Sequence, residues 1–186
     1  MGRKKIISIV FLLPFCFSCW CSDTLIVNSP SGKISLKVWL DKGLKYCISY
    51  DRRIILSPSS IDFLVENKEP LSGNKSFRSS VVKEVNSEII SPVPEKRKII
   101  PDNYRLLSVS FSLPYKVEFR VYNDGAAYRI LTSFKDSIRV INEVAEFSFP
   151  GRPSAFFPAV HKRDDADIFH TSFEEEYPQI GRASCR

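Results

Sequence analysis

The sequence predicts an all-β protein in which antiparallel strands form a β-sandwich. Many short stretches alternate apolar and polar residues with a period of two, which is typical of a strand with one buried face. Gly, Pro, Asn and Asp separate these stretches at fairly even spacing, and no long window shows a helical period. Short strands joined by turns favour a sandwich over a fold built on helices.

The clearest single element is a tight hairpin over residues 117–129. Its first arm alternates apolar and polar side chains, and we expect Phe119 and Val121 to face the core. The Asn-Asp-Gly turn at 123–125 supplies residues that tolerate positive φ, and a second alternation follows it. We assign the polar residues of the hairpin, Arg120 and Asp124 among them, to holding the sandwich together.

Other strands are predicted on both sides of this hairpin. A strand at 25–27 leads through a turn at 28–32 into another hairpin over 34–50, which turns at 41–43. Short strands are further predicted at 54–56, 61–65, 81–90, 107–113, 138–141 and 144–149. Their expected separators are a Ser-Pro-Ser-Ser break at 57–60, a polar loop at 67–80 and a solvated, proline-containing connector at 91–103.

The start of the chain has the layout of a bacterial secretory signal. Basic residues at 3–5 precede an apolar run over 6–17 that is too short to span a bilayer with polar flanks. We therefore predict a signal peptide at 1–21, an exported protein, and no membrane span once the signal is removed. Three outcomes of processing stay open: lipid attachment at Cys19, ordinary cleavage near position 21 or 22, and an uncleaved membrane anchor.

The cysteines argue against a disulfide-rich protein, and the charge balance argues against a nucleic-acid-binding protein. Of five cysteines, three lie in the signal region and Cys185 lies near the end, which leaves Cys47 without a partner, so no disulfide framework is expected. A packed free thiol is favoured for Cys47 over a nucleophile. The formal charge of +6 falls to about +1 without the basic residues of the signal and the tail, which leaves no electrostatic footprint for nucleic acid.

Residues able to do chemistry gather in the stretch 155–177. It holds both histidines, His161 and His170, together with aromatic rings and six carboxylates, namely Asp164, Asp165, Asp167, Glu174, Glu175 and Glu176. Hard oxygen ligands beside flat rings suit a calcium ion and a sugar. The alternative, left open by composition, is an acidic solvated loop whose rings pack against the sandwich edge.

Three segments resemble the N-terminal domain of glycoside hydrolase family 97. They are Ser-Pro-Ser-Gly-Lys-Ile at 29–34, Tyr104, and Phe-Arg-Val-Tyr-Asn-Asp-Gly-Ala-Ala-Tyr-Arg at 119–129, within a similarity that runs from about 25 to 177. The resemblance implies a large super-sandwich of the galactose-mutarotase-like type over 22–179, incomplete at its C-terminal end. Members continue into a catalytic (β/α)8 barrel and a small β domain.

The resemblance also implies a function. Members are periplasmic, calcium-dependent, exo-acting α-glucosidases or α-galactosidases that hydrolyse oligosaccharides. The barrel carries the catalytic carboxylates, so no catalytic residue is expected in this chain, while a glutamate of the N-terminal domain joins the calcium shell. That glutamate matches Glu174, with Glu175 and Glu176 left as alternatives. The other function kept open is a non-catalytic carbohydrate-binding or structural β-sandwich module.

The last residues depart from the family pattern. The segment 180–186 matches nothing expected there, and it is predicted to be a non-native tail on a chain that stops before the barrel. A sandwich that lacks its last strands would have unpaired edges, so we expect the fragment to be marginally stable. The sequence leaves open glucose or galactose as the sugar, retention or inversion, and the oligomeric state.

Overall fold

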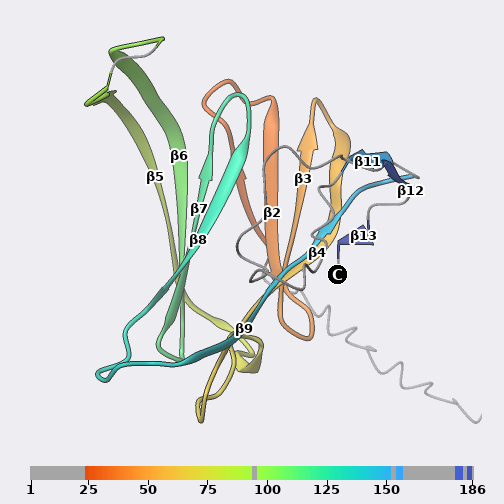
Figure 1. Cartoon of the computed structure of the whole chain (residues 1–186), viewed down its shortest axis with the longest axis vertical. Helices are drawn as coiled ribbons and strands as arrows, with labels where there is room; N and C mark the ends of the chain where they lie inside the picture. Colours follow the sequence, from red (N-terminus) through yellow and green to blue (C-terminus); the bar gives the residue numbers. More distant parts are fainter. Residues whose placement is uncertain (1–23, 94–95, 152–153, 157–178, 182–183, 186) are drawn as a thin grey trace, which may run out of the picture.

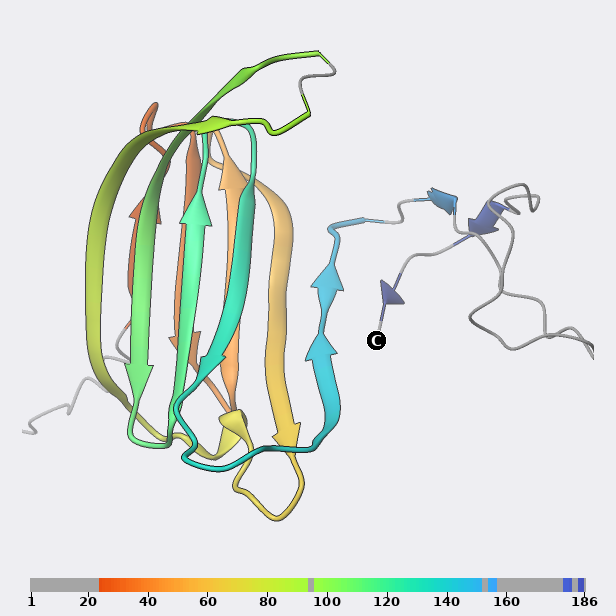
Figure 2. The same ribbon diagram turned by 60° about the vertical axis from the view of Figure 1, so that its left-hand side comes forward.

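Two antiparallel sheets face each other, with their long strands running in similar directions (Figures 1 and 2). The computed structural model describes residues 24–93, 96–151, 154–156, 179–181 and 184–185. One sheet has five strands in the order β1-β2-β3-β4-β9, and the other has four in the order β5-β6-β7-β8. The predicted antiparallel sandwich is confirmed.

The five-stranded sheet begins as a run of hairpins. Its strands pair antiparallel in chain order, as β1 (Leu25–Asn28), β2 (Ile34–Leu40), β3 (Leu44–Tyr50) and β4 (Arg53–Val65). The turn between β2 and β3 holds Lys42 at a φ of 50° and Gly43 at a φ of 125°, which confirms the turn predicted at 41–43. A strand distant in sequence, β9 (Val140–Ala145), then pairs with β4.

The four-stranded sheet is a second run of hairpins. A short 3-10 turn, η1 (Leu71–Gly73), precedes β5 (Phe77–Ile90), β6 (Ile99–Phe111), β7 (Tyr115–Val121) and β8 (Ala126–Thr132). The Tyr122 backbone N–H donates to the Gly125 carbonyl at 2.8 Å and closes the hairpin of β7 and β8. Phe119 and Val121 are buried, so the predicted hairpin and its inward face are confirmed.

The core lies where β1 contacts β6 and β2 contacts β7. Leu36 and Val38 from one sheet are fully buried with Val109 and Val117 from the other. Aromatic rings bridge the two sheets, because the ring of Tyr46 on β3 lies 6.3 Å from that of Phe119 and 6.0 Å from that of Tyr128. Removal of this apolar surface from water is the main favourable term for the fold.

The chain crosses from one sheet to the other between β8 and β9. Figure 2 shows this segment passing beneath the strands. Phe134 and Ile138 in the crossover pack against the core, and the Phe134 ring meets that of Tyr115 edge-on at 5.4 Å. The crossover therefore closes the lower end of the sandwich and places β9 beside β4.

The prediction of two separate strands at 54–56 and 61–65 is wrong. β4 runs through the Ser-Pro-Ser-Ser segment because it bulges there: Leu56 lies opposite Ile48 and Ser59 opposite Tyr46, so two residues face Cys47 alone. Pro58 is one of the two, and a bulge is a place where a strand tolerates a residue with no N–H to donate.

The loop at 67–80 and the connector at 91–103 were predicted too long. β5 starts at Phe77, and β6 starts at Ile99, so residues 86–90 pair with 99–103 in a ribbon. This end of β5 and β6 projects past the other strands (Figure 1). Pro101 fits within β6 because β7 pairs with β6 only from Arg105 onward.

Two short ribbons complete the described strands. β10 (Phe147–Ser148) pairs with β13 (Ser184–Cys185), and β11 (Ser154–Phe156) pairs with β12 (Gln179–Gly181). β12 and β13 include positions of the segment 180–186, whose non-native origin stays a prediction. The predicted signal peptide at 1–21 lies outside the described residues. Within the described ranges, no helix is long and apolar enough to cross a membrane.

Candidate functional site

The predicted calcium ligand lies outside the part of the chain that the structure describes. This holds for Glu174, for the alternatives Glu175 and Glu176, and for His161 and His170. Among the described residues, no group of three or more His, Cys, Asp or Glu side chains is placed to hold a metal ion. The described residues therefore form no calcium shell by themselves, and the assignment of Glu174 stays a prediction.

A buried carboxylate lies on the outer face of the four-stranded sheet. Glu118 on β7 stands opposite Ser108 on β6 and Arg129 on β8. Its Oε2 receives hydrogen bonds from Arg129 Nη2 at 2.6 Å and Nε at 2.8 Å, and its Oε1 lies 2.8 Å from Lys116 Nζ. Ser108 Oγ also donates to Oε1, at 3.4 Å. Both carboxylate oxygens are thus satisfied by partners from three strands.

The charges around Glu118 keep it ionised. The hydrogen bond from Lys116 lowers the pKa of Glu118 most, and the bond from Arg129 adds to it, while burial acts in the opposite direction with a smaller total effect. A carboxylate with a lowered pKa is a poor proton donor at neutral pH. We therefore assign Glu118 to binding its neighbours across the sheet.

Arg120, two residues along the same face, is held by aromatic rings. Its guanidinium carbon lies 4.8 Å from the centre of the Tyr104 ring, which itself lies 5.0 Å from the Tyr122 ring. The Tyr122 hydroxyl donates to Asp102 Oδ1 at 2.9 Å. A hydrogen bond with Tyr122 raises the pKa of Arg120. The predicted structural role of Arg120 agrees with this packing against β6.

The two turns that carry the family-like motifs meet in space. The backbone N–H of Ser31, in the turn after β1, donates to the side-chain oxygen of Asn123 at 2.8 Å. Ser29 is fully buried, and its hydroxyl accepts the N–H of Ile34 at 3.1 Å. Asp124, in contrast, is exposed at the hairpin tip. The first turn and the hairpin tip thus tie together the ends of the two sheets.

An apolar hollow of about 230 Å³ opens between the two sheets at the β8 side. Among the described strands β8 pairs only with β7, so β8 is an edge strand of the four-stranded sheet. Aliphatic and aromatic side chains line the hollow, namely Leu36, Tyr46, Ile48, Ile55, Leu56, Phe119, Ala126, Ala127, Tyr128, Phe147 and Phe149. Such a surface suits another apolar segment.

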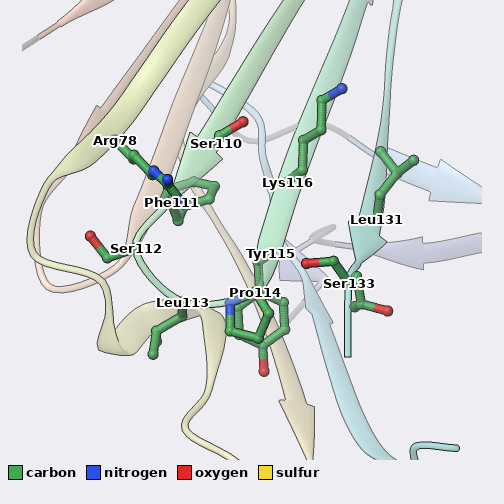
Figure 3. Close-up of a pocket in the computed structure, with 11 residues that line it drawn as sticks. Arg78, Ser110, Phe111, Ser112, Leu113, Pro114, Tyr115, Lys116, Leu131 and Ser133 are labelled. Carbon is green, nitrogen blue, oxygen red and sulfur yellow. The ribbon is translucent and has the colours of Figure 1, made fainter. Parts of the chain in front are cut away.

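A larger, more polar hollow of about 520 Å³ lies at the lower end of the four-stranded sheet. Figure 3 shows Pro114 and Tyr115 between Ser112 on one side and Ser133 on the other, with Lys116 and Arg78 above them. The Tyr115 hydroxyl is engaged, because it donates to the Glu69 carbonyl at 2.7 Å. The hollow is lined by serine and threonine hydroxyl groups and by the cations Arg78 and Lys116, so its surface suits a polar ligand.

Cys47 behaves as the sequence predicts. It is a half-buried free thiol on β3, and burial raises its pKa. A thiol with a raised pKa is a weak nucleophile at neutral pH, because little thiolate is present. Cys47 is therefore a packing residue.

Sequence reasoning missed the Glu118 network and the ring beneath Arg120. The signal was present in the period of two, which places Lys116, Glu118 and Arg120 on one face of a strand. What the sequence lacked was the register that puts Arg129 opposite Glu118. Tyr104, which directly follows the connector predicted at 91–103 and lies in none of the predicted strands, is a buried residue of β6.

These features define a class: a β-sandwich domain with a packed apolar core, a charged outer face on one sheet and an apolar hollow between the sheets. The chain belongs to the family described as Glycosyl-hydrolase 97 N-terminal, which matches residues 27–185. The resemblance identified in the sequence is thereby confirmed.

Known relatives support the same assignment. The chain is 30% identical over 177 residues to a retaining alpha-galactosidase from Bacteroides thetaiotaomicron, a match that covers 94% of this chain and 27% of that relative. A Glycoside Hydrolase Family 97 enzyme from Pseudoalteromonas sp. strain K8, solved with panose, superimposes with a TM-score of 0.65 at 21% identity, over 73% of this chain and 22% of that enzyme. A beta-arabinopyranosidase superimposes with a TM-score of 0.70 at 19% identity, over 83% and 26%. The two structures show the shared fold, and the chain spans about a quarter of each relative's length.

Proposed function

We propose that this chain is the N-terminal domain of an exported, calcium-dependent, exo-acting α-glycosidase that hydrolyses α-linked oligosaccharides. The observation that carries the proposal is the family match over residues 27–185 together with 30% identity to a retaining alpha-galactosidase. Because that relative is a retaining alpha-galactosidase, α-galactosides are the first substrates to test, and α-glucosides are the second.

In this proposal the sandwich supports a separate catalytic barrel. The barrel supplies the acid and the nucleophile or base, and this domain supplies binding surface and one calcium ligand. A hard cation prefers carboxylate oxygens, so Glu174 is the candidate ligand, and the remaining ligands come from the barrel. A metal shared across a domain boundary would fix the two domains relative to each other.

The proposed site of action is the periplasm. The signal layout at 1–21 supports export, and a lipid on Cys19 would hold the protein at a membrane surface. Radiolabelled palmitate incorporation into the wild type, compared with a Cys19→Ser variant, distinguishes lipid attachment from ordinary cleavage.

The decisive experiment uses the full-length protein encoded by the parent gene. Hydrolysis of p-nitrophenyl α-galactoside and α-glucoside is measured with calcium, after chelation, and after calcium is restored. We expect activity that is lost on chelation and returns with calcium. The Glu174→Gln variant should need at least about tenfold more calcium for half-maximal activity, because one charged ligand is gone. Glu88→Gln, on the exposed part of β5, is the matched control and should behave as wild type.

Two results would contradict parts of the proposal. A full-length protein that binds oligosaccharide and hydrolyses neither substrate would support the non-catalytic module instead. If Glu174→Gln left the calcium requirement unchanged, the ligand assignment would move to Glu175 or Glu176, which are tested by the same substitution.

A further inference from the structure

We infer that the outer face of the four-stranded sheet carries a carboxylate-binding site, formed by the side chains of Arg120 and Arg129, which flank Ala127 in the strand register. This inference goes beyond the proposed glycosidase function, which assigns the calcium ligand to Glu174 and the catalytic carboxylates to the barrel. Three observations carry it: the placement of the two arginines, the charge left unpaired on Arg120, and the hollow above Ala127.

The register of β7 and β8 sets the placement. Arg120 lies directly opposite Ala127, and Arg129 follows Ala127 by two residues on the same face of β8. Arg120 and Arg129 are thus diagonal neighbours, a relation that long side chains span readily. The methyl group of Ala127 is too short to fill the space between them. A hollow of about 300 Å³ results, lined by Glu118, Arg120, Tyr122, Ala127, Tyr128 and Arg129.

Arg120 has a fixed orientation and no ion-pair partner in the described part of the chain. Its guanidinium lies on the Tyr104 ring and bonds to Tyr122, and the ion pairs found among the described residues do not include it. Asp102 acts on Arg120 through its charge, and its carboxylate accepts the hydrogen bond of the Tyr122 hydroxyl. A rigid guanidinium without a carboxylate partner is ready to donate two parallel hydrogen bonds.

Arg129 contributes a second set of donors. Its Nε and Nη2 bind Glu118, but its side chain remains 56% exposed, so further N–H groups face solvent. Lys116 on the same face is also partly exposed. Arg120 and Arg129 line the hollow together with Glu118, and with Lys116 and Asp102 nearby three cations stand against two carboxylates, so the local charge favours a negative ligand.

A carboxylate satisfies this arrangement better than a neutral sugar. Its two oxygens match the planar guanidinium geometry and balance the charge of Arg120, whereas hydroxyl groups would leave that charge unmatched. The carboxylate can come from an acidic sugar such as a uronic acid, or from an aspartate or glutamate side chain of another polypeptide segment. The chemistry recognised is the same in both cases.

The test measures binding to the whole chain in calcium-free buffer of low ionic strength, by backbone amide NMR. The probes are galacturonate with galactose as its neutral match, and an acetylated peptide with one glutamate, matched to the same peptide with glutamine. We expect a carboxylate probe to shift the amides of β7 and β8 near Ala127. The tighter-binding probe identifies the source of the carboxylate.

Three variants test the geometry. Arg120→Gln removes the guanidinium, and Ala127→Leu fills the hollow without changing any charge, so each should weaken carboxylate binding at least about tenfold. Arg105→Gln is the matched control, because Arg105 is on β6 of the same sheet and pairs with Glu84. It should change the affinity less than about twofold. The amide spectrum of each variant reports whether the fold is retained.

Equal binding of galacturonate and galactose would overturn the inference, as would binding of neither carboxylate probe. Equal weakening by Arg120→Gln and Arg105→Gln would also overturn it, because the effect would then be general charge attraction. These outcomes leave the glycosidase proposal untouched, since that proposal is tested by hydrolysis and calcium dependence.

Discussion

β7 and β5 belong to the same sheet, yet one is the most buried strand and the other is almost entirely exposed. Every residue of β7 is buried or half-buried, whereas β5 has two half-buried residues, Phe77 and Val85, and is otherwise exposed. β7 has β6 and β8 on its two sides and contacts β2 across the core. β5 is an edge strand, and β6 is the one described strand that pairs with it.

The difference shows that a strand pattern and a buried position are separate properties. Val121 on β7 is fully buried, and Val82 on β5 is 54% exposed, although both are valines in paired strands. Burial depends on what lies opposite, which the local sequence does not contain. The stability of this domain should therefore respond to changes on β7 and tolerate changes on β5.

The largest effect is expected for Phe119→Ala. Phe119 is buried and contacts the rings of Tyr46 and Tyr128, so its loss leaves a cavity between the sheets. We expect the free energy of unfolding to fall by about 3–5 kcal/mol, measured by urea denaturation of the full chain. A loss below about 1 kcal/mol would mean that the centre of β7 is not a packed core.

Glu118→Gln should have an intermediate effect. The substitution keeps the shape of the side chain but removes the charge that Lys116 and Arg129 bind. Because those two cations remain partly exposed to water, we expect a loss of about 1–2 kcal/mol, measured by urea denaturation at pH 7. Glu84→Gln, at the exposed Arg105 pair, serves as the control and should cost less than about 0.5 kcal/mol.

Comparison of the wild type with Glu118→Gln also gives a prediction for the dependence of stability on pH. The pKa of Glu118 is lowered in the folded state, so its contribution to stability is present above the ordinary glutamate pKa of about 4.3 and is lost as pH falls through the folded value. The wild type should therefore lose more stability than Glu118→Gln when the pH is lowered from about 5 to about 3. Glu146, whose pKa is lowered by bonds from Ser60 and Ser148, contributes equally to both proteins. Parallel pH profiles of the urea midpoint would refute the assignment.

The smallest effect is expected on β5. Val82→Ala should change the free energy of unfolding by less than about 0.5 kcal/mol, because the side chain already faces water. The matched substitution Val121→Ala on β7 should cost about 1.5–3 kcal/mol. Similar losses of unfolding free energy for the two substitutions would show that the Val82 side chain is buried in solution, contrary to its exposure in the structure.

Much of the fold could be predicted because hairpins are local. The turns at 41–43 and 123–125 lie between strands that alternate cleanly, so pairing and inward face follow from nearby residues. The break at 57–60 was misjudged, because Pro58 reads as a strand terminator unless a bulge opposite Cys47 accommodates it. The start of β6 was predicted too late, at 107 instead of 99, because its exposed first residues form backbone pairs with β5 that need no apolar pattern.

The candidate site residues also differ in whether nearby sequence or the tertiary structure places them. The sequence located Arg120 and Arg129 in one motif, and the hairpin register alone makes them diagonal neighbours. Tyr104, whose ring lies beneath Arg120, is 16 residues away in the sequence, and only the sheet brings it there. Glu174 remains a prediction from the family resemblance, because it lies outside the described residues.

The sequence by itself determined that this chain is all-β, that residues 34–50 and 117–129 form hairpins, and to which family it belongs. Each of these depends on neighbouring residues, on turn chemistry and on a short motif. The tertiary structure alone decided that β7 is central and β5 peripheral, that Glu118 is buried among two cations, and that Arg120 lacks an acidic partner in the described chain. The physical reason is that burial and electrostatics depend on what lies opposite in space, and strand order rather than strand pattern determines that.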